Sequence, residues 1–423
     1  MKKLAIIGNG IAGITVARHV RKRSDMDITI ISSETEHFFS RTALMYIYMG
    51  HMRFEDTKPY EDRFWIKNNL NLVKAHVVSI DTDARVVRLG NAQNIVYDML
   101  VIATGSKSNK FGWPGQDLTG VQGLYSKSDL ELMERNTANI SGGVVVGGGL
   151  IGIEMAEMLR SREIPVTFLV RENFYWDNVL PTEEAKLISR HVMEHGVDLR
   201  LATELKEIVS DTNGHVRGVI TSRGDEVSCQ FVGLTVGVYP NTDAVQDSTV
   251  EVNRGILVNE FLETNVPQVY AAGDCVEFRT ANPLHPKIEQ LWYTGRMQGE
   301  ALAKTICGER TAYDRGVWFN SAKFFDIEYQ TYGFVNNVPV DGENSLYWEH
   351  DNSRHAIRIV YSSADYSVVG FNLLGIRFRQ NVCQKWIRER RPLHYVLANL
   401  SEANFDPEFF KSYEKEIIAQ YNR

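Results

Sequence analysis

The first thirty residues alternate between apolar and polar stretches in a way that predicts a strand, a helix and a second strand. The apolar run at residues 4–7 is typical of a buried parallel strand, and it ends at Gly8. Residues 11–23 then show helical periodicity with a basic end, and residues 27–32 form a further apolar run. Two strands joined by a helix in this order predict the opening of an α/β fold with a parallel sheet.

The glycines of the first turn suit a bound dinucleotide. Gly8 permits a tight turn, Gly10 lets the backbone approach a pyrophosphate, and Gly13 allows the helix to pack closely on the strand. The helix N-terminus offers unpaired N–H groups to phosphates. Glu34 follows the second strand, where it can accept hydrogen bonds from ribose hydroxyls. An ordinary strand–turn–helix with incidental glycines is the alternative.

The same pattern returns about 140 residues later. A strand at residues 143–146 leads into Gly147-Gly148-Gly149-Leu150-Ile151-Gly152, a helix to residue 160 and a strand at residues 166–170. One unit could hold a flavin dinucleotide and the other a nicotinamide dinucleotide. A duplicated fold with one inactive site is the alternative.

Several later strands are also followed directly by small or acidic residues. Residues 72–102 alternate as a small meander that feeds a buried strand, which ends in Ala103-Thr104-Gly105. Another strand at residues 230–236 ends at Gly237, and a short strand before Gly273 delivers Asp274 to the carboxyl edge of the sheet. Asp274 could bind a polyol or cap a following helix. From residue 318, hairpin strands and helices predict a C-terminal α+β domain.

Composition narrows the class of protein. The 423 residues are 43% hydrophobic and 23% charged, as in globular chains of two or three domains. The net charge of −7 argues against a general nucleic-acid binder, and no apolar run suffices to span a membrane. Because a strand starts near residue 4, we expect no signal peptide and a cytoplasmic location. The four cysteines are widely separated, so we expect neither disulfides nor a metal site.

With these motifs in this order, the chain resembles the FAD-dependent pyridine nucleotide-disulfide oxidoreductases over roughly residues 1–335. Phe39-Ser40-Arg41 and Phe324-Phe325-Asp326-Ile327-Glu328 are most similar to rubredoxin reductases, oxygenase-type ferredoxin reductases and the nitrite-reductase flavoprotein module. The resemblance implies an α/β fold with two three-layer, Rossmann-like domains and a C-terminal α+β domain. The FAD domain would comprise residues 1–112 and 241–317, the NAD(P) domain residues 113–240, and the last domain residues 318–423.

The resemblance also implies two sets of cofactor-binding residues. Arg41 would lie beside the flavin and the pyrophosphate, Asp274 on the ribityl chain, and Trp292 near the flavin at the start of a helix. The full FAD set is Gly8, Gly10, Ile11, Ala12, Gly13, Glu34, Arg41, Val77, Ala103, Thr104, Gly105, Gly273, Asp274 and Trp292. The NAD(P) set is Gly147, Gly149, Leu150, Ile151, Gly152, Glu154, Arg171 and Gly237. No side chain is expected to act as a catalytic acid or base, because the flavin mediates hydride transfer.

Two departures from the family pattern bear on the reaction. Residues 37–50 contain no cysteine where disulfide reductases carry a redox pair, so disulfide reduction is not expected. Cys275 is interpreted as core packing. Tyr46 stands where many rubredoxin reductases have a lysine, which weakens a direct assignment to them.

The resulting hypothesis is an FAD-dependent NAD(P)H oxidoreductase that passes electrons to a small carrier such as ferredoxin or rubredoxin. An NAD(P)H oxidase or quinone reductase is the first alternative. A redox-sensing flavoprotein like the apoptosis-inducing factor group, or a dissociable subunit of a larger reductase, is another. A homodimer is possible.

Two further points stay open in the sequence. Val170 stands where NAD-specific relatives place an acid, and Arg171 beside it slightly favours NADPH; the adjacent Glu172 could instead bind the ribose diol. A basic cluster near the C-terminus could steer an acidic carrier or could be a solvated helix face. That cluster comprises Arg377, Arg379, Lys385, Arg388, Arg390 and Arg391.

Overall fold

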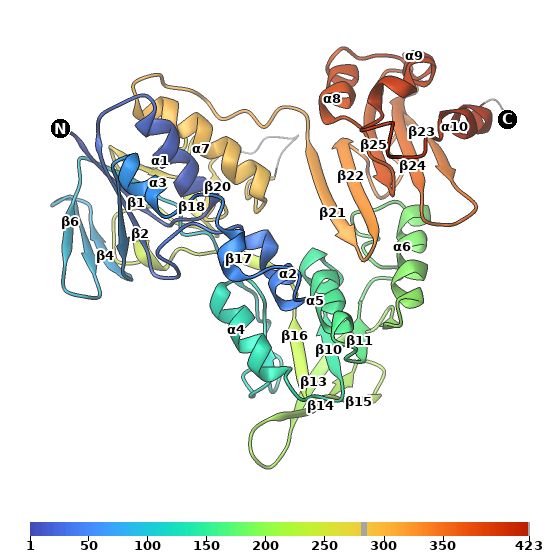
Figure 1. Ribbon diagram of the computed structural model, residues 1–423, viewed down its shortest axis with the longest axis horizontal. Helices are drawn as coiled ribbons and strands as arrows, with labels where there is room; N and C mark the ends of the chain where they lie inside the picture. Colours follow the sequence, from blue (N-terminus) through green and yellow to red (C-terminus); the bar gives the residue numbers. More distant parts are fainter. Residues whose placement is uncertain (281–285, 422–423) are drawn as a thin grey trace. The chain divides into compact units, whose positions relative to one another are not determined.

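The computed structural model describes residues 1–280 and 286–421 and divides into two compact units (Figure 1). Unit 1 comprises Met1–Asn109, Gly123–Arg135 and Gly237–Arg315. Unit 2 comprises Lys110–Gln122, Asn136–Val236 and Gly316–Arg423. Among the helices of the described residues, none combines the length and apolar character needed to cross a membrane. The division into three domains stays a prediction.

Unit 1 is built on a parallel sheet of five strands in the order β19-β7-β1-β2-β3. The strands are β1 (Lys3–Ile7), β2 (Asp27–Ser32), β3 (Leu70–Lys74), β7 (Met99–Ile102) and β19 (Val269–Ala271). Counted along the chain, the third, second, first, fourth and fifth of these strands lie side by side in that order across the sheet, so the sheet is doubly wound. Residues 4–7 and all of β7 are buried, as expected for strands covered on both faces.

Two helices of unit 1 pack closely because small residues line their contact. Helix α1 (Ile11–Arg21) lies against α7 (Trp292–Ile306), and the two run side by side in Figure 1. A Cβ on Gly299 would come within 2.8 Å of the carbonyl oxygen of Ala12, so only glycine allows this approach. Helix α1 ends at Arg21, two residues before the predicted end.

The remaining elements of unit 1 are short. The predicted meander is confirmed as an antiparallel sheet of β4 (Val77–Asp81), β5 (Val86–Leu89) and β6 (Asn94–Val96). Two small pairings join β8 (Ser106–Ser108) to β17 (Val238–Pro240) and β18 (Ile256–Val258) to β20 (Val276–Phe278). The other helices are α2 (Leu44–Tyr48), α3 (Arg63–Lys67) and α4 (Lys127–Asn136), whose last residue belongs to unit 2. Short 3₁₀ turns cover Arg41–Ala43, Phe54–Thr57 and Asp243–Val245.

Unit 2 repeats this plan, which confirms the duplication predicted from the sequence. Its parallel sheet has the order β12-β11-β10-β16-β9. The strands are β9 (Val121–Gln122), β10 (Gly143–Val146), β11 (Val166–Leu169), β12 (Asp198–Arg200) and β16 (Phe231–Leu234). The helices are α5 (Leu150–Ser161) and α6 (Thr182–Glu194). The meander of β13 (Leu205–Ser210), β14 (Val216–Thr221) and β15 (Glu226–Ser228) follows the third strand of the repeat, as β4–β6 does in unit 1.

A second sheet in unit 2 confirms the predicted hairpins and helices of the last hundred residues. Its antiparallel strands have the order β21-β22-β25-β24-β23. They are β21 (Phe319–Phe324), β22 (Ile327–Gly333), β23 (Glu343–Glu349), β24 (Ala356–Ser362) and β25 (Val368–Leu374). The helices are α8 (Gln380–Arg388), α9 (Leu393–Ala398) and α10 (Glu414–Tyr421), with a 3₁₀ turn at Leu400–Ala403.

One local expectation is wrong. Asp274 does not cap a following helix, because strand β20 starts two residues later and pairs with β18. Its carboxylate is therefore left for side-chain partners.

Candidate dinucleotide-binding sites

The turn between β1 and α1 has the geometry that a bound pyrophosphate requires. Gly8 has a φ of +111°, which only glycine adopts readily, and a Cβ there would collide with the backbone of Ala103. A Cβ on Gly13 would collide with the carbonyl oxygen of Gly8, so helix and strand touch at this point. Gly10, the N-cap of α1, faces open space: a Cβ there would meet nothing within 4 Å. The N–H groups at Ile11 and beyond are thus approachable by an anion.

The turn between β10 and α5 reproduces this geometry in unit 2. Gly147 has a φ of +109°, and a Cβ on it would lie 2.7 Å from the carbonyl oxygen of Thr235. Gly149 is the N-cap of α5, with open space where a Cβ would stand, and a Cβ on Gly152 would collide with Gly147. Leu150 begins the helix. Both turns therefore keep the features that a dinucleotide needs, which argues against one being inactive.

Asp274 lies half-buried after β19 at the carboxyl edge of the unit 1 sheet, among other polar side chains. Its Oδ2 accepts hydrogen bonds from the hydroxyls of Ser106 at 3.4 Å and Tyr125 at 3.3 Å. Burial raises the pKa of Asp274 to about 6, although Tyr125, Arg41 and Ser106 oppose the shift. The side-chain amide of Gln290 donates to the Ser106 hydroxyl at 2.8 Å. A half-buried carboxylate with such long hydrogen bonds can accept stronger ones from a polyol chain.

Arg41 and Glu34 form an ion pair next to this group. Arg41 donates to both carboxylate oxygens of Glu34, at 3.0 and 2.6 Å, and to the carbonyl oxygen of Tyr125 at 2.7 Å. The backbone N–H of Lys127 also donates to Glu34, at 2.7 Å. The Arg41 guanidinium lies 4.6 Å from the centre of the Tyr125 ring. The structure therefore brings Glu34, Arg41 and Asp274 together around Tyr125.

The loop at residues 103–105 is fixed by contacts within unit 1. Gly105 has a φ of +73°, and a Cβ on it would lie 2.8 Å from the Tyr125 hydroxyl. The Thr104 hydroxyl donates to the carbonyl oxygen of Asn241 at 2.5 Å. Ala103, which precedes them, pairs with β1 through its N–H. The backbone N–H of Ser106, directly after this loop, donates to the Tyr125 hydroxyl at 2.9 Å and so positions Tyr125 beside Asp274.

The remaining predicted FAD residues occupy three places in unit 1. Trp292 is the first residue of α7, as expected, so it lies at the positive end of that helix. Ala12 lies in the first turn of α1, and Gly273, with a φ of +87°, sits against its Cβ. Val77 is buried on β4, in a different sheet from the glycine turn.

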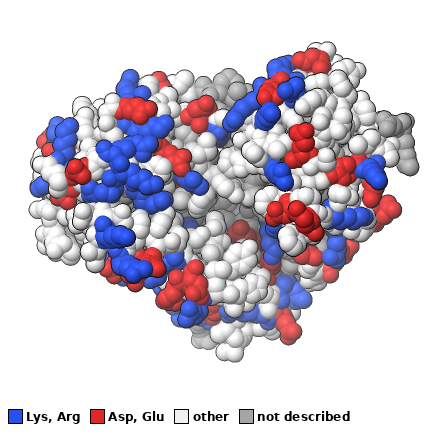
Figure 2. All heavy atoms as spheres, turned by 45° about the horizontal axis from the view of Figure 1, so that its top comes forward, with Lys and Arg blue, Asp and Glu red and all other residues white. Residues whose placement is uncertain are grey.

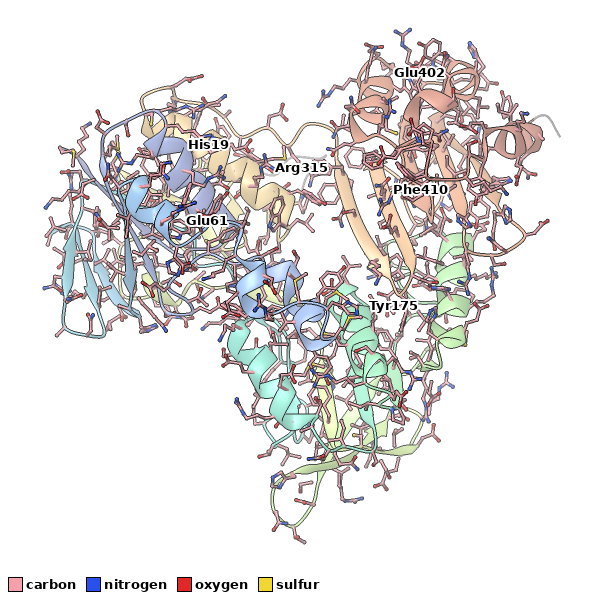
Figure 3. All side chains as sticks on the ribbon, in the orientation of Figure 1. His19, Glu61, Tyr175, Arg315, Glu402 and Phe410 are labelled. Carbon is pink, nitrogen blue, oxygen red and sulfur yellow. The ribbon has the colours of Figure 1, made fainter. Side chains whose placement is uncertain are left out.

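Glu154 and Tyr175 lie beside the second turn. Burial raises the pKa of Glu154 to about 7, and the neighbouring Glu157 adds to the shift. The Tyr175 hydroxyl donates to the carbonyl oxygen of Gly149 at 3.0 Å (Figure 3). Its fully buried ring packs against Phe168 and Phe324. Tyr175 thus anchors the residue that caps α5.

The residues after β11 place an acid towards the same turn. Val170 is buried, whereas the Arg171 side chain is 72% exposed and donates to Glu172 at 2.9 Å. A Cβ on Gly148 would lie 3.5 Å from Oε2 of Glu172, so this carboxylate faces the glycine turn. Gly237 lies in unit 1, where its carbonyl oxygen accepts from the N–H of Asn109 at 3.0 Å.

The cysteines offer no accessible thiol beside Asp274. Cys275 is fully buried, and its Sγ donates weakly to the carbonyl oxygens of Ile102 and Ala272 at 3.5 Å. Burial raises its pKa, which keeps the thiol protonated. Cys229 and Cys383 are buried too, and no described cysteine forms a disulfide. The interpretation of Cys275 as core packing agrees with this environment.

A model of the pyridine nucleotide-disulphide oxidoreductase family matches residues 2–299. The chain belongs to this family. It is 28% identical over 341 residues to a nitrite reductase [NAD(P)H] of Bacillus subtilis, a match that covers 79% of this chain and 41% of that protein. It is also 28% identical over 312 residues to an NADH-rubredoxin oxidoreductase of Clostridium acetobutylicum, covering 74% and 76%. The chain thus spans about two fifths of the nitrite reductase and three quarters of the second relative.

A solved structure supports the fold of this family member. The ferredoxin reductase for the CYP199A2 system from Rhodopseudomonas palustris superposes with a TM-score of 0.80 at 22% identity, covering 89% of this chain and 91% of that one. Together with the family match, this confirms the predicted family and the predicted α/β fold, and it assigns the chain to the oxidoreductases.

The sequence did not reveal three residues around Asp274. Ser106, Tyr125 and Gln290 are separated from it by 168, 149 and 16 residues along the chain, and none lies in a recognisable motif. Ser106 follows the predicted Ala103-Thr104-Gly105 turn directly, which is the one local signal that pointed towards this group.

Proposed function

We propose that this chain is an FAD-dependent NAD(P)H reductase that delivers electrons to a small redox carrier of the ferredoxin or rubredoxin type. The observation that carries the proposal is the pair of equivalent glycine turns, one in each unit, together with the buried thiol of Cys275. Two dinucleotide sites suit a reaction between two dinucleotides. Because the Cys275 thiol is buried, no redox-active disulfide beside Asp274 can accept electrons from the flavin.

The chain's own residues would bind and orient the cofactors. When bound, FAD supplies the chemistry, because it can accept a hydride and release electrons singly. The N–H groups of α1 would hold its pyrophosphate, and Asp274 would accept hydrogen bonds from its ribityl hydroxyls. The positive end of α7 at Trp292 would favour negative charge nearby. No side chain needs to move a proton during hydride transfer, so positioning is the protein's main contribution.

We also propose NADH as the preferred reductant. The carboxylate of Glu172 faces the second glycine turn, where it can bind the ribose diol and repel a 2′-phosphate. Arg171, which slightly favours NADPH in the sequence, is mostly exposed and paired with Glu172. The arrangement therefore supports the second of the two interpretations that the sequence left open.

The carrier is proposed to dock with help from a basic surface on unit 1. His19, which Figure 3 labels, lies among basic side chains. Burial lowers the pKa of His19, Glu300 raises it, and the positive charges of Lys22, Arg18 and Arg23 lower it further. Figure 2 shows Lys and Arg side chains gathered on unit 1. Like charges gathered in this way attract an acidic partner.

The C-terminal basic cluster is less suited to this task. Arg377 pairs with Glu328, and Arg390 pairs with Asp365 at 2.7 Å. Arg391 pairs with Glu389 at 2.8 Å. These ion pairs offset much of its positive charge and favour its interpretation as a solvated face. A cytoplasmic location and a homodimer stay predictions.

Steady-state turnover with separate acceptors tests the proposal. NADH oxidation is followed with ferredoxin, rubredoxin, a quinone or oxygen as the sole acceptor. The proposal expects turnover with ferredoxin or rubredoxin at least about tenfold faster than with the others, a difference of about 1.4 kcal/mol in activation free energy. Equal or faster turnover with oxygen or quinone would support the oxidase or quinone reductase instead. Slow turnover with every acceptor, with dimerisation on reduction, would support a redox sensor.

A further inference from the structure

Two histidines and an aspartate of unit 2 meet outside the dinucleotide sites. His191 lies in the last turn of α6, and His195 is the C-cap of that helix, so the two share one face. Asp326 lies in the two-residue turn between β21 and β22. One nitrogen of each imidazole and one carboxylate oxygen lie within 4.8 Å of one another. Among the described residues this is the one group of three such side chains gathered closely enough to hold a metal ion.

His191 is buried beside Asp326. Its side chain is 1% exposed, and neither Nδ1 nor Nε2 makes a hydrogen bond of good geometry. Nε2 lies 2.5 Å from Oδ1 of Asp326 but lacks the alignment of a hydrogen bond, and Nδ1 is 3.9 Å from Oε2 of Glu194. Two ligands of one metal point to a shared centre and not at each other. A close but poorly aligned approach is therefore compatible with a shared cation.

His195 presents a lone pair to the same carboxylate. Its Nδ1 lies 2.9 Å from the carbonyl oxygen of His191, which can only accept, so Nδ1 carries the proton. In the neutral ring Nε2 is then an acceptor, and it faces Oδ1 of Asp326 at 3.4 Å. A neutral imidazole and a carboxylate at this distance both offer lone pairs, so a cation between them, either a proton or a metal ion, stabilises the pair. A backbone bond on the far nitrogen is also how proteins orient histidines that bind metals.

Neighbouring groups hold the cluster in place and leave one side open. The rings of His195 and Phe325 stack with centres 4.4 Å apart. Arg354 binds Oδ2 of Asp326 at 3.0 Å and leaves Oδ1 for the histidines. The Asp326 side chain is 54% exposed, so water can reach the centre.

We propose that His191, His195 and Asp326 bind a divalent cation of the zinc class, with water as a further ligand. Two imidazoles and one carboxylate form a donor set that suits Zn²⁺ and its first-row neighbours. Bonds of about 2.0–2.2 Å in a tetrahedral centre place ligand atoms about 3.3–3.6 Å apart, which small side-chain rotations would reach here. The ion would tie α6 to the turn between β21 and β22. The expectation of no metal site rested on the wide spacing of the cysteines. The ligands proposed here are instead two histidines and an aspartate, and His195 and Asp326 are 131 residues apart in the sequence.

Zinc binding to the metal-stripped holoenzyme tests the proposal. Zn²⁺ is titrated in competition with a chromogenic chelator, and one ion per chain is expected. Asp326→Asn and His195→Gln should each weaken binding by at least about 100-fold, because even an outer partner of a metal ligand contributes about 10- to 100-fold. Asp326 is half exposed, so its variant should fold, which a thermal melt verifies.

A matched control separates this site from other histidines. His355 lies in the same unit, with its ring centre 5.9 Å from that of His350, and His355→Gln should leave zinc affinity unchanged. Co²⁺ provides a second readout: its absorption beyond the flavin bands should appear in the wild type, disappear on adding Zn²⁺ and be absent in Asp326→Asn. The proposal is overturned if zinc does not bind stoichiometrically, or if Asp326→Asn and His195→Gln bind it as tightly as the wild type. Loss of binding in His355→Gln would overturn it equally.

Discussion

Gly10→Ala should weaken FAD binding without unfolding the protein. Gly10 has a φ of −72°, which alanine adopts freely, and the added Cβ would meet nothing within 4 Å. Alanine reduces the entropy of the unfolded chain but is a poorer N-cap than glycine, and each effect is worth roughly 1 kcal/mol or less with opposite signs. The free energy of unfolding of the cofactor-free protein should therefore change by less than about 1 kcal/mol.

The same methyl group should weaken FAD binding strongly. It occupies the space through which a pyrophosphate would approach the N–H groups of α1. Losing one hydrogen bond to a charged group costs about 1.5–3 kcal/mol, which corresponds to about 10- to 150-fold in Kd. Fluorescence titration of the cofactor-free protein with FAD measures Kd, and urea unfolding of the same preparation measures stability.

Gly149→Ala is the matched control, because Gly149 has the same place and the same open space in unit 2. This variant should keep its FAD and lose affinity for the reduced nicotinamide, seen as a higher NADH concentration for half-maximal flavin reduction. The reasoning is refuted if Gly10→Ala binds FAD as tightly as the wild type. It is also refuted if Gly149→Ala loses FAD to the same extent.

Three further predictions concern single side chains. Glu172→Gln should raise KM for NADH by about tenfold or more and not raise that for NADPH, because one charged hydrogen bond to the ribose is lost; steady-state kinetics with both reductants checks this, and equal changes would contradict it. Cys275→Ala should keep carrier reduction within about twofold of the wild type, since a buried protonated thiol is not a nucleophile; a large loss of turnover would argue for thiol chemistry. Burial raises the pKa of Asp274 from 3.8 to about 6, so the cofactor-free protein loses stability as the pH rises through this range and the carboxyl ionises. Asp274→Asn should then raise the free energy of unfolding at pH 8 by up to about 3 kcal/mol and change it little at pH 4, as measured by urea unfolding; the same gain at both pH values would contradict this account.

A paired charge reversal tests the docking surface. Lys22→Glu with Arg23→Glu should raise KM for an acidic ferredoxin at low salt, because both side chains are exposed on the basic surface of unit 1. The control is Lys385→Glu with Arg388→Glu in the C-terminal cluster, which should have a smaller effect. A larger effect from the control pair would move the docking surface to that cluster.

Local patterns made both glycine turns predictable. The run from β1 through Gly13 contains the apolar strand, the positive-φ glycine and the close-packed glycine within eleven residues, so no distant information is needed. The repeat at β10 and α5 is predictable for the same reason. Strand β2 was predicted with its observed bounds.

Features that depend on residues far apart in the chain could not be predicted from the sequence. Strands β8 and β17 have three residues each, too few to show a period, and they exist because they pair with each other. Tyr125 reaches Asp274 from a segment that precedes α4. The histidines of α6 acquire a partner only when the turn after β21 folds beside them. None of these contacts can be predicted from a short stretch of neighbouring residues in the sequence.

Anaerobic mixing of the purified protein with NADH tests the central claim most directly. The account predicts a yellow protein whose flavin absorbance bleaches rapidly with NADH and returns when a ferredoxin or rubredoxin is added. A colourless protein that fails to take up FAD, or a flavin that neither NADH nor NADPH reduces, would contradict it.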